Sequence, residues 1–468
     1  MSLPGLSLPG LGDSESLIGN ISSTGISAAS TADQPTRTET LKPQTEWRFE
    51  APFQGPPYTI RLLSGQAELF GAELAPKQAY NLAGTKGAVF TWHGCQLEMS
   101  GEAESEYVGL ETEYAMRWMN VHGMLESSRE TAKQGVTDEG PRVLVVGPES
   151  SGKTSLIRSL ATRAVKMGRT PTVVNFDTRE GLLAPPGTFT AVTLGSQIDV
   201  EHGYGIAPIS GATTTPVQTP LVYHVPYANP NERAEVSKAL ITRTALIVMN
   251  RLEEDPRAKQ SGILIDTPSS FNDPKTNYDL LNHVISEFSI SIILTLGSER
   301  LYNDMTRRHA TESPPSPTAV LRISNPGGAV QRDPSFTTQA HARAIREYFF
   351  GPAREPLNPH SHTLSFADLT IYRANSAALD AELGPHAADL EIVAPSMDLL
   401  NRLLAIKWAA GAADAAAVRN SAVMGFVYVA EVDEAKQRVR FLAPHPQRWG
   451  DRALVFGGYP SVVVGMIG

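Results

Sequence analysis

One stretch of the chain has the residue types and the spacing needed to hold a phosphate chain. Residues 147–154 have the sequence Gly-Pro-Glu-Ser-Ser-Gly-Lys-Thr, which fits the pattern G-x-x-x-x-G-K-T. Glycines let backbone N–H groups turn inward around phosphate oxygens, and a helix that begins there points its positive end at them. In this pattern Lys153 reaches the β- and γ-phosphates, and the Thr154 hydroxyl ligates Mg²⁺. The stretch therefore predicts a nucleoside triphosphate site with magnesium.

The flanking sequence predicts the strand and the helix that such a loop requires. Val143–Val146 is an apolar, largely β-branched run directly before the loop. Leu156, Ile157, Leu160 and Ala164 fall on one face of a helix directly after it. A chance match in a glycine-rich turn is the alternative, and these flanks argue against it.

Two aspartates follow apolar strands later in the chain. Thr172–Phe176 leads into Asp177, and Gly262–Ile265 leads into Asp266. Parallel strands end at one edge of a sheet, so we expect both carboxylates beside the phosphate loop. Asp177, placed beside the loop, could hold the metal or take the proton of an acceptor hydroxyl, and Asp266 is its rival as the metal-side carboxylate. A helix cap or a loop salt bridge is the structural alternative for each.

A guanidinium often completes a site for phosphoryl transfer. A fourth strand is predicted over Ser289–Leu294, and the helical stretch that follows it, Glu299–Arg308, carries Arg300, Arg307 and Arg308. A mobile lid usually occupies this place, so we expect Arg300 to contact the γ-phosphate. A solvated helix face is the alternative.

The elements that must position these residues divide the chain into four parts. Residues 136–350 alternate strands with helices, which predicts an α/β domain with a parallel sheet that carries the phosphate loop. Residues 45–135 predict an N-terminal β-sandwich with a linking helix, because short strands alternate with glycine-rich turns. Residues 351–468 predict a small C-terminal β-rich α/β domain, and residues 1–44 a disordered arm.

The linking helix is expected from Glu111 to about Lys133. Met116, Met119 and Leu125 are its expected buried side, and we interpret this stripe as core packing.

Composition excludes several classes of protein. The 468 residues carry a net charge of −9, which does not fit a broad basic face for nucleic acid. RNA contact is therefore expected to be local or through a partner. A single cysteine excludes an internal disulfide framework. No apolar run approaches the roughly 20 residues that span a bilayer, and the N-terminus lacks a signal peptide pattern. We expect a cytosolic or nuclear protein without a membrane contact.

Two nucleotide-hydrolysing classes fit poorly. Asp266 is followed by Thr-Pro-Ser, whereas switch II of a GTPase would have Asp-x-x-Gly, and the sequence has no Asn-Lys-x-Asp to recognise guanine. Nothing suggests the ring interface or the trans-acting arginine of an ATPase motor.

Several segments resemble the polynucleotide 5′-hydroxyl kinase family, and within it the fungal type of the pre-mRNA cleavage and polyadenylation subunit. The similarity runs in order from about residue 45 to the C-terminus, and it is most specific in the phosphate loop and in the block that starts at Arg346. The matching segments are Glu46–Glu50, Phe90–Cys95, Gly140–Val143, the phosphate loop, Pro186-Gly187, Leu221–His224, Ser261–Ser269, Glu299–Asn303 and Arg346–Gly351.

The resemblance implies three domains, with the N-terminal domain closing over the adenine of ATP. It implies that Glu46 and Lys86 contact the base and nucleoside, and that Asp177 serves the metal and the acceptor. The residues that it assigns to the phosphates are Ser150, Ser151, Gly152, Lys153, Thr154 and Ser155.

The sequence departs from the active kinases of this family on the acceptor side. They have Asp-x-x-Gln after the second strand, where this chain has Asp177-Thr-Arg-Glu180. They have Thr-x-Gly-Trp after the third strand, where this chain has Thr267-Pro-Ser-Ser270. The loss of Gly-Trp removes part of the clasp for an RNA end, and Glu180 adds a negative charge that repels it.

The resemblance and these departures together imply a nuclear, ATP-bound scaffold of the pre-mRNA 3′-end cleavage complex that holds ATP without turnover. The expected partners are the scaffold subunit of the cleavage factor that also binds RNA polymerase II, and other cleavage and polyadenylation subunits. An active ATP-dependent RNA 5′-hydroxyl kinase is the alternative, with Lys153, Asp177 and Arg300 in catalysis.

Overall fold

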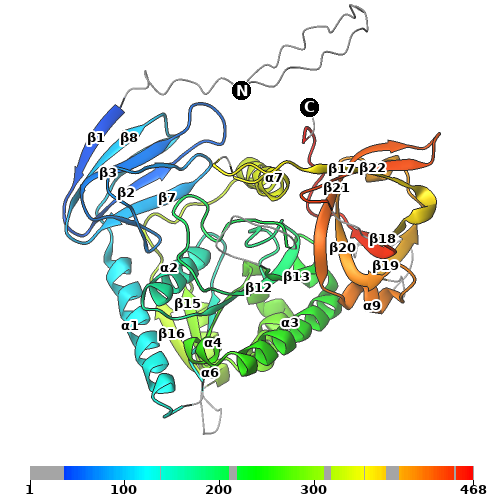
Figure 1. Cartoon of the computed structure of the whole chain (residues 1–468). Coiled ribbons are helices and arrows are strands. Elements are labelled where there is room, and N and C mark those ends of the chain that lie inside the picture. The colour runs from blue at the N-terminus through cyan, green and yellow to red at the C-terminus, as the bar shows by residue number, and fades with distance from the viewer. Residues whose placement is uncertain are drawn as a thin grey trace, which may run out of the picture. The chain divides into compact units, whose positions relative to one another are not determined.

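The computed structural model in Figure 1 describes most of the chain beyond its first 35 residues. The described residues are 36–137, 139–209, 219–309, 318–352, 354–375, 389–446 and 450–466. A β-sandwich, a central α/β part and a β-rich part follow one another in chain order. This is the fold class that the sequence predicts, with one correction to the central sheet given below.

The β-sandwich consists of two antiparallel sheets with an apolar layer between them. One sheet has the order β1 (Thr36–Leu41), β8 (Cys95–Ser100), β3 (Thr59–Gly65), β6 (Ala79–Asn81). The other has the order β5 (Ala72–Glu73), β4 (Glu68–Leu69), β7 (Lys86–Thr91), β2 (Thr45–Glu50), β9 (Ser105–Gly109). Phe49, Ile60 and Leu97 belong to the buried cluster between the sheets. The β-sandwich that the sequence predicts is confirmed.

The prediction of a disordered arm over residues 1–44 is wrong at its C-terminal end. Strand β1 pairs antiparallel with β8, from Thr36 opposite Ser100 to Leu41 opposite Cys95. Its sequence, Thr-Arg-Thr-Glu-Thr-Leu, is polar because β1 is an edge strand with alternate side chains in solvent. That polarity resembles a linker when only the sequence is considered. Residues 1–35 lie outside the described residues.

The linking helix is α1 (Glu113–Lys133), and its buried face differs from the expected one. Leu125 is fully buried, but Met116 is 49% exposed and Met119 is only partly buried. Trp118 and Val121 occupy the buried face with Leu125. There α1 packs against α2 (Lys153–Lys166) and α4 (Pro256–Ser261) of the central part. Apolar residues spaced by three and four occur on the methionine face of the helix and on the Trp118 face. The spacing alone therefore did not show which of the two faces is buried.

The central sheet is mixed, which corrects the predicted parallel sheet. Its order is β13 (Leu221–His224), β12 (Thr188–Thr193), β11 (Thr172–Asn175), β14 (Ile263–Asp266), β10 (Arg142–Val146), β15 (Ile292–Leu296), β16 (Ala319–Ile323). The last five strands of this order are parallel to one another, whereas β12 and β13 pair antiparallel at one edge. Strand β14 lies between β10 and β11, so the strand beside the phosphate loop ends in Asp266, and Asp177 is one strand further away.

Helices cover both faces of this sheet. They are α2 (Lys153–Lys166), α3 (Ala234–Glu254), α4 (Pro256–Ser261), α5 (Asp279–Glu287) and α6 (Glu299–His309). Successive side chains of β10 point to opposite faces of the sheet. Val143 and Val145 pack with residues of α1 and α2, whereas Leu144 and Val146 pack with residues of α3 and α5. A strand buried on both sides is continuously apolar, which is why its sequence predicted it clearly.

Helix α7 (Pro334–Phe350) connects the central part to the C-terminal sheet. That sheet has the order β17 (His360–Ser365), β22 (Arg438–Ala443), β21 (Val423–Asp433), β20 (Leu403–Ala410), β23 (Arg452–Phe456), β18 (Thr370–Ala374), β19 (Leu390–Val393), and α9 (Ala415–Asn420) lies beside it. Tyr348 and Phe349 of α7 pack with Phe426 and Tyr428 of β21. Among the described helices, none combines the length and the apolar character needed to cross a membrane.

Candidate functional site

The phosphate loop joins β10 to α2 with a backbone that requires its glycines. Ser150 and Gly152 have positive φ angles of 55° and 87°, and Gly152 is the N-cap of α2. A Cβ atom on Gly147 would lie 2.7 Å from the carbonyl oxygen of Leu296, so no side chain fits there without displacing β15. The loop thus turns its backbone around the first turn of a helix, which is the arrangement that binds phosphate.

The two polar residues that open α2 already have partners. The Lys153 ammonium donates to the carbonyl oxygens of Pro148 at 2.8 Å and Gly147 at 3.2 Å, so it lies folded over the loop. The Thr154 hydroxyl donates to a carboxylate oxygen of Asp266 at 2.6 Å. The predicted magnesium ligand and one of the two candidate carboxylates are therefore in direct contact.

Asp266 has the surroundings expected of a carboxylate at a metal. Its Oδ1 is buried and has no hydrogen-bond partner among the described residues, while Oδ2 accepts from Thr154. Burial raises the pKa of Asp266 to about 7, against the opposing effects of Lys153 and Thr154. A buried carboxylate oxygen without a partner is costly. Oxygen ligands suit Mg²⁺, usually with several waters retained, so these residues fit that ion.

Asp177 lies close enough to Asp266 to influence it. Burial, and then the charge of Glu180, raise the pKa of Asp177. Its Oδ1 accepts from the backbone N–H of Arg179 at 3.0 Å. The charge of Asp177 in turn helps to raise the pKa of Asp266. The structure brings Lys153, Asp177 and Asp266 together at one end of the sheet.

A cavity of about 180 Å³ adjoins these residues, and several parts of the chain line it jointly. The β-sandwich contributes Lys86 and Phe90, and α1 contributes Tyr114 and Trp118. The lining residues from the loop and the start of α2 are Glu149, Ser150, Gly152, Lys153, Thr154 and Ser155. Asp177 and Glu180 also line it. So do Pro326, Gly328, Ala329, Val330 and Arg332 of the segment 326–332, which we call the strap. Ser151 is buried within the loop, where its hydroxyl donates to the carbonyl oxygen of Pro148.

The two residues assigned to the nucleoside lie at different depths. Lys86 lines the cavity, and its ammonium pairs with Glu50 at 2.6 Å. Glu46 is fully buried behind the cavity wall, where it accepts from Arg48 Nε at 2.6 Å and from the Tyr114 hydroxyl. Tyr114 itself lines the cavity. The contacts of Glu46 and Lys86 with a nucleoside stay predictions.

Arg300 lies away from this cavity. It lies on α6, its side chain is 77% exposed, and it pairs with Asp304 at 3.9 Å. The guanidinium groups that line the cavity within the described residues are those of Arg163, Arg179 and Arg332. The sequence analysis missed Arg332. The only signal near it is Gly327-Gly328, a glycine pair shortly before a helix.

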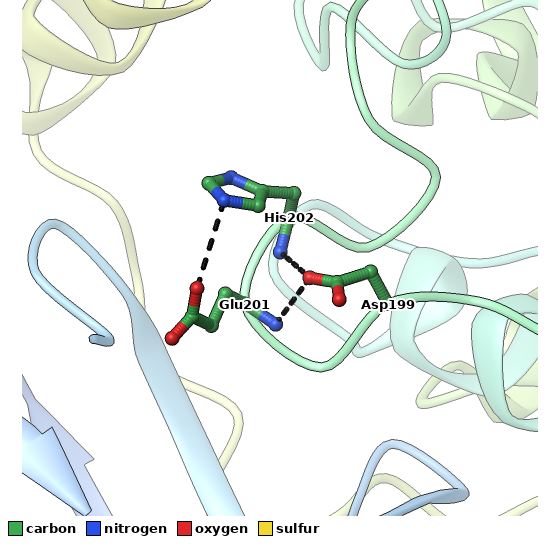
Figure 2. A group of neighbouring side chains, drawn as sticks. All are labelled: Asp199, Glu201 and His202. Carbon is green, nitrogen blue, oxygen red and sulfur yellow. Dashed lines mark hydrogen bonds and ion pairs between the residues drawn. The ribbon is translucent and has the colours of Figure 1, made fainter. Parts of the chain in front are cut away.

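Among the described residues outside this site, Asp199, Glu201 and His202 form a group of possible metal-ligating side chains, shown in Figure 2. Asp199 accepts from the backbone N–H groups of Glu201 and His202, both at 2.8 Å, so it shapes its own turn. Glu201 accepts from the backbone N–H of Asn81 at 2.6 Å and from Arg354 at 2.7 Å. Because Glu201 already pairs with a cation, we interpret this cluster as a structural link between β6 and the chain after α7.

The loop geometry and the five parallel strands show that this is a P-loop protein. A β-sandwich precedes its P-loop domain in the chain, and a β-rich part follows it.

Comparisons with known proteins identify its family. The family description "mRNA cleavage and polyadenylation factor CLP1 P-loop" matches residues 147–351. The descriptions "N-terminal beta-sandwich domain of polyadenylation factor" and "Pre-mRNA cleavage complex II protein Clp1" match residues 40–132 and 357–460. The chain belongs to the Clp1 family of mRNA cleavage and polyadenylation factors, as the resemblance to its fungal type implied.

Individual relatives and solved structures support the same family. The mRNA cleavage and polyadenylation factor CLP1 of Phaeosphaeria nodorum is 44% identical, over 92% of this chain and 95% of that protein. The factor of Botryotinia fuckeliana is 40% identical over 99% of this chain and 100% of that protein. A solved complex of wild-type Clp1p with residues 454–563 of Pcf11p matches with a TM-score of 0.82 and 27% identity, covering 91% of this chain and 98% of that one. A second, described as showing an extended Pcf11p–Clp1p interface and the basis of ATP loss in a point mutant, matches with a TM-score of 0.80 and 25% identity, covering 91% and 99%.

Proposed function

We propose that this protein is an ATP-holding scaffold subunit of the nuclear pre-mRNA 3′-end cleavage and polyadenylation complex. The observation that carries the proposal is the shared cavity, which the β-sandwich, α1, the phosphate loop and the strap all line. A ligand that contacts all of these parts stabilises their arrangement by its binding free energy. ATP would then act as a structural component of the surface that partners bind.

The residues at the loop support the assignment of the phosphate end. Ser150, Ser151, Gly152 and Ser155 would surround the phosphates together with Lys153, whose carbonyl contacts are replaceable by phosphate oxygens. Magnesium would be held at Thr154 with Asp177 and Asp266, and when bound it neutralises phosphate charge. The buried, unpartnered Oδ1 of Asp266 favours that residue as the principal carboxylate at the metal.

The charges on the acceptor side of the cavity support a protein that retains ATP and does not transfer its phosphate to RNA. Lys153 exerts its charge on three carboxylates at once, those of Asp177, Glu180 and Asp266. Burial opposes ionisation of Glu180, but Arg332, Lys153 and Arg179 together outweigh it, so the pKa of Glu180 is lowered and the group is negatively charged at neutral pH. A fixed negative charge at this point repels the phosphates of an approaching RNA 5′ end.

The relatives support the partners that we propose. The similar solved structures contain Clp1p bound to Pcf11p, so we propose a Pcf11-type subunit, the cleavage-factor scaffold that also binds RNA polymerase II, as the direct partner. Other cleavage and polyadenylation subunits complete the assembly. The net charge of −9 supports an RNA contact that is local or made through partners.

A kinase assay distinguishes this proposal from its alternative, an active RNA 5′-hydroxyl kinase. The full-length protein is incubated with magnesium, γ-labelled ATP and a 5′-hydroxyl oligoribonucleotide, beside a bona fide polynucleotide kinase. We expect no label on the RNA above the level of a Lys153→Ala variant. Label transfer that scales with enzyme and disappears in Lys153→Ala and Asp177→Asn would establish the kinase and contradict the scaffold without turnover.

A further inference from the structure

Tyr204 and Arg158 share an unusual feature with Asp266, because each has a buried polar atom without a hydrogen-bond partner among the described residues. The three atoms are the Tyr204 hydroxyl oxygen, Arg158 Nε and Asp266 Oδ1. Tyr204 and Asp266 are only 2% and 1% exposed. Buried polar groups are almost always paired in folded proteins, either with the chain itself or with ordered water. These atoms come from the loop after β12, from α2 and from β14, so an explanation must involve all three elements.

Asp266 and Tyr204 lie on the same face of the central sheet. Side chains alternate along a strand, so Leu264 and Asp266 share one face of β14. Leu264 belongs to a buried cluster that also contains Ile157 of α2 and Tyr204. Asp266 Oδ2 accepts from Thr154, also on α2. The two unpartnered oxygen atoms are therefore on the side of the sheet that α2 covers.

Arg158 holds the backbone beside Tyr204 against α2. Its Nη2 donates to two carbonyl oxygens of the turn Asp199–Gly203, at 2.9 and 3.2 Å. A Cβ atom on Gly203 would lie 3.1 Å from Arg158 Cζ, so the residue before Tyr204 lies directly against the guanidinium. Arg158 follows Thr154 by four residues, which is about one turn of the helix. The loop that carries Tyr204 is thus fixed one turn from the proposed magnesium ligand on α2.

The charges of these groups agree with that placement. Burial raises the pKa of Tyr204, the charge of Arg158 opposes the increase, and the charge of Asp266 adds to it. Burial lowers the pKa of Arg158 to about 10, and Tyr204 and Asp199 oppose the decrease. At neutral pH the Tyr204 hydroxyl therefore keeps its proton, and Arg158 keeps its charge. Both can donate a hydrogen bond.

The three unpartnered atoms are complementary to one water molecule. Arg158 Nε can only donate, an ionised Asp266 can only accept, and the Tyr204 hydroxyl can do either. A buried water typically makes about three hydrogen bonds to groups that otherwise lack a partner. A water that accepts from Arg158 and Tyr204 and donates to Asp266 Oδ1 would pair all three atoms. A carboxylate oxygen has two lone pairs, so Oδ1 would retain one for a metal ion.

We propose that an ordered water links Tyr204 and Arg158 to Asp266, and that Tyr204 is thereby a positioning residue for the metal side of the nucleotide site. The water fixes the orientation of the carboxylate that we propose for magnesium. Tyr204 is not among the residues that line the cavity, so it acts through Asp266 and not on the nucleotide. The inference rests on the proposed ATP site and deepens it.

The metal dependence of ATP binding by the full-length protein tests the proposal, after bound nucleotide is removed with a chelator. The measured quantity is the ratio of the ATP dissociation constant in EDTA to that in saturating Mg²⁺. Tyr204→Phe keeps the ring and loses only the hydroxyl. We expect it to lower this ratio about tenfold, as the loss of a group that supports a metal ligand typically does. The ATP dissociation constant in EDTA should stay unchanged.

Tyr428→Phe is the matched control, because it removes a hydroxyl from another buried tyrosine. That hydroxyl donates to Asn401 at 2.7 Å and to the carbonyl oxygen of Val463 at 2.8 Å, within the C-terminal part. The ratio should equal that of the wild type. The melting temperatures of the nucleotide-free variants establish that they are folded.

A high-resolution crystal structure of the nucleotide-free protein tests the water itself. We expect one ordered water within hydrogen-bond distance of the Tyr204 hydroxyl and Asp266 Oδ1. Density that shows no water between these atoms would overturn the proposed link.

The binding outcomes separate the inference from the proposed function. A wild type that binds ATP more tightly with Mg²⁺, while Tyr204→Phe keeps the same ratio, would overturn the inference alone. So would an equal weakening of ATP binding with and without Mg²⁺, because a general structural defect changes both constants together. A wild type that binds ATP under neither condition would overturn the proposed function, and this inference with it.

Discussion

Lys153 acts electrostatically on three carboxylates at the phosphate site. Its ammonium lowers the pKa of Asp177, Glu180 and Asp266, in each case against the effect of burial. Lys153 alone cannot neutralise these carboxylates and a triphosphate together, and the arginines that line the cavity already pair with glutamates. A nucleotide should therefore bind as its magnesium complex. The hydrogen bond between Thr154 and Asp266 joins the first turn of α2 to the carboxylate that we propose for the metal.

Lys407 is a second unusual charged residue, far from this site in the sequence and on β20 of the C-terminal sheet. Its side chain is 1% exposed, and its ammonium donates to the carbonyl oxygen of Arg419 at 3.3 Å. Burial lowers the pKa of Lys407 to about 7. Burial, and then the charge of Lys407, lower the pKa of the neighbouring His224 on β13 to about 3. The pair thus adds two buried basic groups between the central and C-terminal sheets.

Stability should therefore depend on pH through Lys407. The unfolded lysine has a pKa near 10.4, so between about pH 7 and 10 the unfolded chain binds a proton that the folded chain does not. The contribution of Lys407 to the free energy of unfolding therefore rises as pH increases from about 7 to 10. Lys407→Met should raise stability at pH 7 by about 1–3 kcal/mol, because an amine without a carboxylate partner leaves the core. Urea unfolding at pH 7 and 9 measures both effects.

Other groups also titrate between pH 7 and 9, so the test is the difference in pH dependence between the wild type and Lys407→Met. The matched control is Lys436→Met, because that lysine is exposed and pairs with Asp433 on the surface. A Lys407→Met protein whose stability changes between pH 7 and 9 as much as that of the wild type would contradict the assignment.

At the scale of elements, α1 contains a glycine that its helix does not need. Gly123 lies in the middle of α1, faces solvent and has no atom within 4 Å of the position a Cβ would take. Gly147 is the opposite case, because there a Cβ would meet the backbone of β15 at 2.7 Å. The same substitution at these two positions should therefore have opposite effects.

Gly123→Ala should stabilise the protein by about 0.5–1 kcal/mol, because alanine reduces the backbone entropy lost when the helix forms. Nucleotide binding should stay unchanged. Gly147→Ala should weaken nucleotide binding, since the loop or Leu296 must move. Urea unfolding and ATP titration of the two variants check this. A destabilised Gly123→Ala protein, or full ATP affinity in Gly147→Ala, would show that the local packing differs from that described.

The sequence predicted elements well where burial imposes a clear pattern. The continuously apolar strands β10, β14 and β11 could be recognised, and so could the ends that carry Asp177 and Asp266. Strand β1 could not, because a polar edge strand lacks that signal. The sequence did not predict that β12 and β13 belong to this sheet as antiparallel strands. Whether two strands pair parallel or antiparallel depends on tertiary contacts, which a short stretch of sequence does not specify.

The same limit applies to the candidate site. The loop motif specifies Lys153 and Thr154, since the chemistry requires those types at that spacing. Arg300 was predicted because a helix after the fourth strand is the usual place for a lid, and Arg332 was missed. Its exposure and its pairing with Asp304 depend on how α6 packs, and the position of Arg332 depends on glycine contacts with Arg48, which lies far away in the sequence.

At the scale of the molecule, the nucleotide cavity and the Glu201 contacts both connect the β-sandwich to the rest of the chain. Glu201 joins Asn81 of β6 to Arg354, and the cavity joins Lys86 and Phe90 to the phosphate loop. A bound nucleotide would add its binding free energy to this arrangement. This is the physical basis for the scaffold role that we propose.

Nucleotide retention tests this account most directly. The full-length protein is incubated with ATP and magnesium, freed of excess nucleotide by gel filtration, and weighed by native mass spectrometry. We predict one intact ATP per chain in the wild type and in a Lys275→Ala/Thr276→Ala control, an exposed Lys-Thr pair outside the cavity. Lys153→Ala/Thr154→Ala should carry none. A wild-type mass that equals the polypeptide alone, or that shows ADP in place of ATP, would contradict a scaffold that holds its nucleotide unchanged.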